Sequence, residues 1–341
     1  MQLSVPNVRI ADVETCDFGL MPSVATDCLL RAAHPTDWRR YRASGTARRF
    51  LAELGVERRY LTHIPGEAPM SSRLNAMDLA RSAVSRMQAR RPADLEALDA
   101  LIFVSTSNPN PCNSQAALLA GEFGFHASCL DLKAGCSGGV LGLMQAALLI
   151  QGGCERVLVV MAENLSQLTP PEDLRMLLTV GDGAACVLVE RHPGPGFLSM
   201  LHGTEASLAR AMEVRTPFPP ATPGARYAFE VQDATATSAF IASRWRGLYH
   251  ESLAASGTAD GQLAHWFFHQ THGAQVTSLL KDLGVAPART ATIVDQHGNM
   301  GTPTFACAMA RGFGRIRRGD RYLLQAVGGG VSWAAILAEH A

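Results

Sequence analysis

Lysine is almost absent from this sequence, and a net charge is absent altogether. Lys133 and Lys281 are the only lysines among 341 residues, and the 30 basic side chains balance the 30 acidic ones. A chain without excess charge has no bulk attraction for nucleic acid or for an anionic membrane surface. No apolar run reaches the length of a membrane-spanning helix, and no signal-peptide pattern opens the chain. We therefore expect a cytoplasmic protein that binds neither nucleic acid nor membrane.

Paired cysteines are also missing. The eight cysteines are scattered along the chain without a CxxC spacing, which is typical of neither a disulfide framework nor a zinc site. His269 and His272 stand three residues apart, but the sequence offers no third ligand near them. We expect no bound metal, and we expect most of the cysteines to be small buried apolar side chains.

What the sequence does contain is an internal repeat. The apolar segment at 98–106 (LDALIFVST) has a counterpart 165 positions later at 263–271 (LAHWFFHQT). A second pair of apolar segments begins at Arg156 (RVLVVMAE) and at Arg321 (RYLLQAVGGG), again 165 positions apart. Strands that are apolar throughout are typical of a sheet covered by helices on both faces. The sequence therefore predicts an α/β fold built from two similar halves.

Cys136 stands where a predicted strand (SCLDLKAG) gives way to a predicted helix (VLGLMQAALLI). A thiol at a helix N-terminus faces free backbone N–H groups and the positive end of the helix dipole, which favours the thiolate. The small neighbours Gly135 and Ser137 to Gly139 leave room for a substrate carbonyl. Position alone leaves another interpretation open, namely a cysteine simply packed into a tight turn.

His269 and Asn299 occupy equivalent positions in the second half. His269 ends the strand HWFFHQ, where a neutral imidazole can donate to a carbonyl oxygen or move a proton near pH 7. Asn299, in HGNMG, precedes a predicted helix, so its amide could cap that helix or donate to an oxyanion. Ligands of α/β folds lie at such strand ends, and a duplicated architecture would bring the three residues together.

These segments resemble β-ketoacyl-acyl carrier protein synthase III and its relatives in the thiolase superfamily. Five motifs correspond in order, and the resemblance spans most of the chain: AGCSGG at Cys136, GDGAACVLVE from Gly181, FFHQ at His269, HGNMG at Asn299 and VGGGVSW from Val327. It implies a five-layer αβαβα fold, usually a homodimer. It divides the chain into a half with the nucleophile, 1–190, and a half with the histidine and the asparagine, 191–341.

The resemblance also implies a mechanism. Cys136 would be acylated by a thioester, and His269 and Asn299 would stabilise the enolate formed when a malonyl unit loses carbon dioxide. The enolate would then attack the acyl-cysteine, while the backbone N–H groups of Cys136 and Gly329 form the oxyanion hole. No cofactor is expected beyond the phosphopantetheine of an acyl carrier protein or of coenzyme A, which carries the substrate.

The sequence departs from the family in several places. Arg49 and Glu53 replace a tryptophan and an arginine that hold the adenine of coenzyme A, and Ala274 replaces an arginine that meets the phosphate of the carrier. These changes favour an acyl carrier protein as partner, with Lys281 as a contact, and a secondary pathway of polyketide or fatty-acid type.

Two further substitutions concern the acyl group. Cys112 stands where the partner subunit commonly supplies a bulky aromatic to the acyl pocket, which predicts room for a larger acyl chain. Lys133 stands where an alanine is common, and the sequence gives it no role.

Two rival functions stay open. An acyltransferase on the same scaffold would pass the acyl group to an alcohol or amine without forming a carbon–carbon bond. A non-catalytic subunit of a heterodimer would keep the fold and lose the chemistry. The presence of Cys136, His269 and Asn299 together favours condensation over both.

Overall fold

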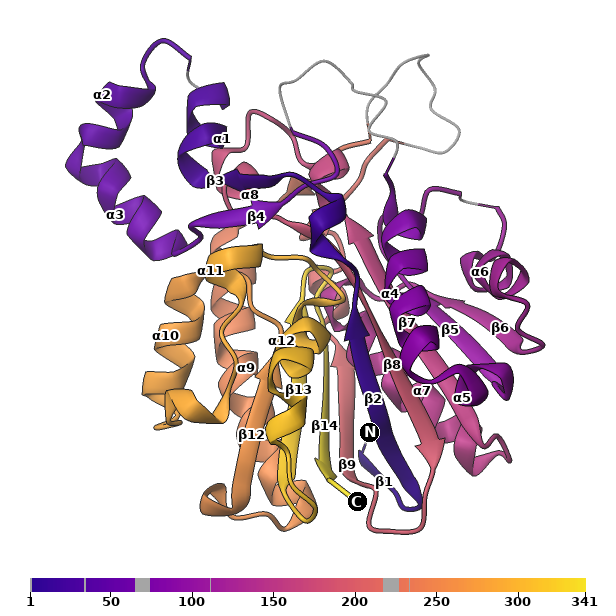
Figure 1. Cartoon of the computed structure of the whole chain (residues 1–341). Helices are drawn as coiled ribbons and strands as arrows, with labels where there is room; N and C mark the ends of the chain where they lie inside the picture. The colour runs from indigo at the N-terminus through magenta and orange to yellow at the C-terminus, as the bar shows by residue number, and fades with distance from the viewer. Residues whose placement is uncertain (1, 34, 65–73, 111, 217–226, 233) are drawn as a thin grey trace.

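Two stacked five-stranded sheets form the frame of the protein (Figure 1). The computed structural model describes all residues except 1, 34, 65–73, 111, 217–226 and 233. The first sheet has the order β2 (Val8–Thr15), β8 (Asp182–Arg191), β7 (Arg156–Asn164), β5 (Ala100–Val104) and β6 (Ser128–Leu132). The second has the order β1 (Gln2–Val5), β9 (Phe197–Thr204), β14 (Ser332–Glu339), β13 (Arg321–Gly328) and β12 (Leu263–Phe268).

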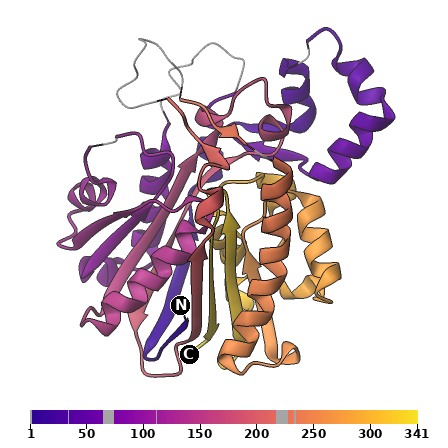
Figure 2. The same ribbon diagram turned by 180° about the vertical axis from the view of Figure 1, so that it is seen from behind.

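Helices cover both faces of both sheets. The helices α7 (Gly138–Gln151) and α12 (Thr304–Gly312) lie between the sheets and share one apolar core with them. Outside the first sheet lie α4 (Ala76–Arg90) and α6 (Gln115–Phe123), and outside the second lie α9 (Ala234–Ser256) and α10 (Gly273–Asp282). Figure 2 shows α9 running along the outer face of the second sheet. The predicted αβαβα layering is thereby confirmed.

The strand β5 illustrates why these segments form buried strands. Its side chains alternate between two cores: Ala100, Ile102 and Val104 face the central helices, whereas Leu101 and Phe103 face α4 and α6. All five are at most 1% exposed. A strand with an apolar residue at every position fits where helices cover both faces of its sheet.

The predicted repeat is visible in the strand pairing. β7 begins at Arg156 and β13 at Arg321, and each pairs in parallel with one neighbour (β5 or β12) and antiparallel with the other (β8 or β14). The edge strands β6 and β1 extend the two sheets beyond the shared core of the repeat. The division of the chain at residue 190 stays a prediction, and the structure adds that β1 pairs with β9 in the second sheet.

Shorter elements complete the fold. A small layer at one end of the molecule, at the upper left of Figure 1, contains β3 (Ser23–Ala25), α1 (Thr26–Ala33), α2 (Trp38–Ala43), α3 (Gly45–Leu54) and β4 (Arg58–Tyr60). The remaining short α-helices and strands are α5 (Pro92–Glu96), α8 (Leu174–Leu177), β10 (Met212–Glu213), β11 (Glu230–Val231) and α11 (Val294–His297). In the part of the chain that the structure describes, no helix combines the length and the apolar character needed to cross a membrane.

Candidate active site

A cavity of about 1030 Å³ brings together residues from both halves of the repeat. Cys136, His269 and Asn299 all line it, as do the glycines 328–330 that follow β13. The sequence predicted that these three side chains would come together where the two halves of the repeat meet. All three residues line this one cavity, and their catalytic roles stay predictions.

Cys136 lies in a tight turn directly before a central helix. Residues Gly135–Ser137 form one turn of 3-10 helix, and α7 begins at Gly138. Gly135 has a φ of 55°, a left-handed conformation that favours glycine, and a Cβ there would lie 2.8 Å from the Gly329 carbonyl oxygen. A Cβ on Gly328 would lie 2.8 Å from that of Cys136. Glycines on both segments therefore allow the nucleophile turn and the loop after β13 to touch.

The thiol of Cys136 is neutral in the free protein. Burial raises its pKa to about 12, and the carboxylate of Glu163 acts in the same direction. The backbone N–H groups of Gly329 and of Cys136 itself face the sulfur and lower the pKa, but they do not outweigh burial. Cys136 keeps some accessible surface because it faces the cavity, although protein surrounds it on its other sides. The expected preference for thiolate is therefore wrong for the resting protein.

Glu163, at the end of β7, is the buried carboxylate behind the thiol. It is 0% exposed and accepts hydrogen bonds from the backbone N–H groups and hydroxyls of Thr106 and Ser107 and from the hydroxyl of Thr302. Burial raises its pKa, and these donors oppose that shift. Sequence reasoning missed this residue, although a charged side chain at the end of the apolar run RVLVVMAE was the available signal.

His269 presents an unsatisfied imidazole to the cavity. The side chain is 1% exposed, and neither ring nitrogen has a hydrogen-bond partner among the residues that the structure describes. Burial lowers the pKa of His269 to about 4. The Gly301 carbonyl lies nearby and raises the pKa slightly, although it is not placed to form a hydrogen bond with the ring. At neutral pH the ring is therefore uncharged and offers one N–H donor and one acceptor.

The backbone holds Asn299 in place on both sides. Its N–H donates to the Thr179 carbonyl at 2.8 Å, and its own carbonyl accepts from Gly181 at 2.9 Å. The side-chain Oδ1 accepts from the Gly301 N–H at 2.9 Å. That bond fixes the amide so that its NH₂ remains available to the cavity. The alternative of a helix cap is wrong, because α12 begins only at Thr304, with Pro303 as its capping residue.

The other predicted residues differ in position. Gly329 lines the cavity beside Cys136, and Lys133 and Ala274 line it as well. Lys281 is exposed on α10 and does not contribute to the lining. Cys112 is exposed on the loop before α6, outside the cavity of its own chain, so its predicted place in a partner's pocket stays a prediction.

Much of the remaining wall is apolar. Helix α9 and the segments around β10 and β11 contribute Ala211, Met212, Val214, Phe229, Val231, Ile241 and Trp245. Two arginines that sequence reasoning missed, Arg175 on α8 and Arg246 on α9, also line the cavity. An apolar wall with a few polar groups is typical of a small-molecule site.

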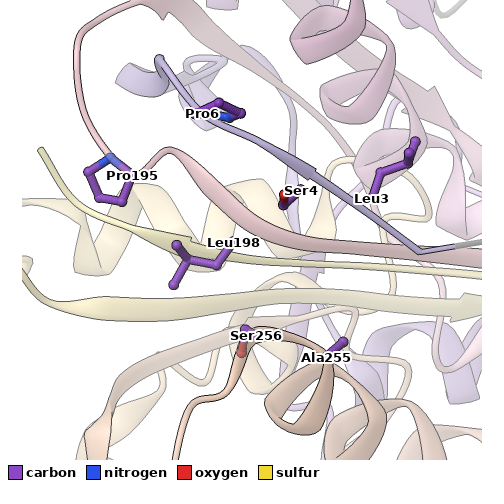
Figure 3. A pocket seen from close by; sticks show the side chains of 7 residues that line it. All are labelled: Leu3, Ser4, Pro6, Pro195, Leu198, Ala255 and Ser256. Atoms are coloured by element: carbon purple, nitrogen blue, oxygen red, sulfur yellow. The ribbon is translucent and has the colours of Figure 1, made fainter.

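A second hollow contains no reactive group. It has a volume of about 620 Å³ and lies where β1, β9 and the end of α9 meet (Figure 3). Its lining is Leu3, Ser4, Pro6, Pro195, Leu198, Ala255 and Ser256. Among the described residues no three histidine, cysteine or acidic side chains gather into a metal site either.

The layering and the cavity define a thiolase-like enzyme of the acyltransferase class. Residues 130–206 match the family 3-oxoacyl-[acyl-carrier-protein] synthase III, and residues 253–340 match its C-terminal part. β-Ketoacyl-[acyl-carrier-protein] synthase III of Gloeobacter violaceus is 31% identical over 273 residues, which cover 76% of this chain and 82% of that protein. The chain belongs to the β-ketoacyl-acyl carrier protein synthase III family.

Solved structures share the fold at lower identity. The 3-oxoacyl-(acyl-carrier protein) synthase of Burkholderia xenovorans superposes with a TM-score of 0.83 at 23% identity, covering 100% of this chain and 96% of that one. OleA of Xanthomonas campestris, solved with bound lauric acid and lauroyl-CoA, superposes with a TM-score of 0.79 at 20% identity, covering 98% and 99%. The predicted family and fold are thereby confirmed.

Proposed function

We propose that this enzyme carries its acyl substrate on Cys136 and then extends it by a decarboxylative Claisen condensation. The observation that carries the proposal is that Cys136, His269 and Asn299 line one cavity. Among the described residues, neither imidazole nitrogen of His269 and no hydrogen of the Asn299 amide NH₂ has a hydrogen-bond partner. Buried donors without partners cost free energy unless a ligand satisfies them.

In the first step the thiol attacks a bound acyl thioester. The Cys136 sulfur forms a bond to the carbonyl carbon, the carrier thiolate leaves, and the proton of Cys136 passes to that thiolate. Since the resting thiol is neutral, its proton is lost only when the substrate is in place, and the uncharged His269 ring is a suitable acceptor on the way. The N–H groups of Cys136 and Gly329, which face the sulfur, bind the developing oxyanion.

In the second step a malonyl thioester loses carbon dioxide. The electron pair of the breaking carbon–carbon bond forms a thioester enolate, whose oxygen accepts hydrogen bonds from His269 and Asn299. The enolate carbon attacks the acyl-cysteine, and the Cys136 thiolate leaves and takes up a proton from solvent. A neutral imidazole suits this role because it donates without a full positive charge that would have to be desolvated.

The donor is proposed to be an acyl carrier protein in a secondary pathway. Arg49 and Glu53, which replace the family's adenine-binding residues, are exposed on α3 and do not line the cavity. Ala274 lines the cavity where the family has an arginine, whereas Arg175 and Arg246 supply positive charge from neighbouring helices. Lys281, exposed on α10, remains a proposed contact for the acidic carrier.

A homodimer is also proposed. The edge strand β6 leaves Leu130 44% exposed, and Leu118 on the adjacent α6 is 39% exposed. Apolar side chains along an open sheet edge are suited to pairing with a second copy. In such a dimer the Cys112 loop would reach the partner's acyl pocket.

Intact-protein mass spectrometry tests the proposal. The wild-type enzyme and Cys136→Ala are incubated with hexanoyl-acyl carrier protein or hexanoyl-CoA, and then with malonyl-acyl carrier protein. We expect the wild type alone to gain the acyl mass, faster from the carrier protein, and to release carbon dioxide with formation of a β-keto product. Loading without carbon dioxide release would replace condensation by simple acyl transfer, and no loading from either donor would refute the acyl-enzyme.

A further inference from the structure

Lys133 lines the active-site cavity, and the residue is exposed. It follows β6 directly and precedes Cys136 by three residues. The Ser105 N–H donates to the Leu132 carbonyl at 3.3 Å, so Lys133 leaves the sheet beside the segment that includes Thr106. Three residues of extended chain span at most about 11 Å, so the ammonium group is within reach of a group attached to the sulfur.

The other charged side chains of the lining have counterparts within the described residues. Glu213 accepts from Arg215 at 3.0 Å and from Gln232 at 2.8 Å. Arg246 donates to Asp282 at 3.0 Å, and the guanidinium of Arg175 lies 5.9 Å from the Phe50 ring centre. No hydrogen bond or ion pair joins Lys133 to the described residues, so its charge is not used to hold the fold together.

Two protein roles for this lysine are excluded by the site itself. Glu163 is not its counter-ion, since the carboxylate is already occupied by Thr106, Ser107 and Thr302. Lys133 is also no activator of the thiol, because the groups that shift the pKa of Cys136 are Glu163 and two backbone N–H groups. The ammonium is therefore free to meet a group that the substrate brings into the cavity.

We propose that Lys133 is a specificity residue whose ammonium pairs with a carboxylate at the far end of the acyl chain, so that the enzyme prefers acyl groups derived from dicarboxylic acids. This inference rests on the proposed acyl-enzyme at Cys136. The carboxylate of a malonyl extender is a poor alternative, because that group must leave as carbon dioxide and a fixed ammonium would stabilise the state before its loss. A carboxylate at the end of the acyl chain is not consumed, so its ion pair with Lys133 stabilises the substrate, the transition state and the product alike.

A lysine at position 133, where most basic residues of the chain are arginines, is consistent with binding a carboxylate. Thirty side chains of this chain are basic, and all but Lys133 and Lys281 are arginines. A lysine offers a compact ammonium on a flexible stem, which can follow carboxylates on acyl chains of different length, whereas an arginine presents a rigid planar fork.

The test compares two acyl groups of the same shape. Glutaryl and 5-methylhexanoyl thioesters of N-acetylcysteamine end in a carboxylate and in an isopropyl group, respectively, and neither needs a carrier protein. We expect wild-type Cys136 to be loaded with glutaryl faster than with 5-methylhexanoyl, by roughly ten- to a hundredfold for a hydrogen bond to a charged group. Lys133→Met should remove that preference, and Lys133→Arg should keep most of it.

A variant with a negative charge at position 133 gives a second, independent test. Lys133→Glu should reject glutaryl and accept a 6-aminohexanoyl group better than the wild type does. The proposal would be overturned if the ratio of the glutaryl to the 5-methylhexanoyl loading rate were the same in the wild type and in Lys133→Met. It would also be overturned if the Lys133 variants changed the sedimentation of the protein and left this ratio unchanged. Loading of 5-methylhexanoyl in every variant keeps the acyl-enzyme intact as a separate result; absence of all loading would refute the proposed function itself.

Discussion

The carboxylate of Glu163 accepts a hydrogen bond from the hydroxyl of Thr302 at 3.1 Å, across 139 residues of sequence. Glu163 ends a strand of the first sheet, and Thr302 precedes α12 in the second half. A Cβ on Gly301 would lie 3.3 Å from the Cγ of Glu163, so the carboxylate also supports the turn at Gly301. That turn fixes Asn299 through its N–H and places its carbonyl near His269. Glu163 is therefore a positioning residue at the junction of the two halves.

Glu163→Gln should increase the reactivity of Cys136 and weaken the fold. The substitution removes a negative charge that raises the pKa of the thiol, so the pH profile of iodoacetamide labelling should move to lower pH. The NH₂ group of the new glutamine would face N–H and O–H groups that donate hydrogen bonds to the carboxylate of the wild type. Two donors cannot bond to each other, so the free energy of unfolding should fall by about 1–3 kcal/mol. Labelling of Cys136 followed by mass spectrometry, and urea unfolding, measure the two effects.

Thr302→Val is the matched control for this variant. It removes one donor to Glu163 and leaves the charge, so it should lower stability while the labelling profile stays close to that of the wild type. If Glu163→Gln and Thr302→Val lower stability without either moving the profile, Glu163 has only a structural role.

The pH dependence of iodoacetamide labelling at Cys136 in the wild-type enzyme tests whether the thiol has a raised pKa. A free cysteine has a pKa of about 8.5, so its alkylation rate levels off above that pH. Burial raises the pKa of Cys136 to about 12, which predicts a rate that still rises about tenfold per pH unit between pH 7 and pH 10. A plateau below pH 9 would mean that a cation adjoins the sulfur in solution.

His269 should make the fold sensitive to mild acid. Its pKa is lowered to about 4 in the folded protein, whereas an unfolded histidine titrates near 6.5. The unfolded chain therefore takes up a proton first, so this contribution to stability is complete above pH 6.5 and is lost as the pH falls toward 4. At pH 5 the loss amounts to about 2 kcal/mol.

The variant His269→Asn isolates this effect from the other buried histidines. Between pH 7 and pH 5 it should lose less unfolding free energy than the wild type, as measured by urea titration. The exposed His126 supplies the control, since His126→Asn should follow the wild type. Equal losses in all three proteins would show that the imidazole is not held neutral.

The layers of the fold could be predicted from the sequence because the repeated segments are apolar strands, which are easily recognised. Arg156 and Arg321 each begin a strand, and continuous burial explains why β5, β7 and β13 contain few polar residues. The helix predicted after Asn299 is present, but it begins only at Thr304, because Gly298 and Gly301 both have positive φ values and the chain turns there first. Small residues in a sequence do not show where a turn ends and a helix begins.

The site was predictable only in part, for a physical reason. Cys136, His269 and Asn299 each stand in a recognisable motif, but the charge state of the thiol depends on a neighbour from another strand. Glu163 lies 27 residues beyond Cys136, and only the folded sheet places it behind the sulfur. Arg175 and Arg246 likewise reach the cavity through helix packing, which sequence spacing does not reveal.

Asn299→Asp should separate loading from condensation. An aspartate keeps an oxygen that can accept from the Gly301 N–H, so the local turn and the thermal stability should change little. It loses the NH₂ donor and adds a negative charge beside the enolate oxygen, which removes one of the two proposed donors. We expect Cys136 to be loaded at close to the wild-type rate, while release of carbon dioxide from malonyl-acyl carrier protein falls by about 10²–10³-fold. Intact-protein mass spectrometry measures the first step and ¹⁴C release from labelled malonyl the second. If both steps fall together in a protein that melts like the wild type, Asn299 acts in acyl transfer as well, and the assignment of two donors to the enolate alone is wrong.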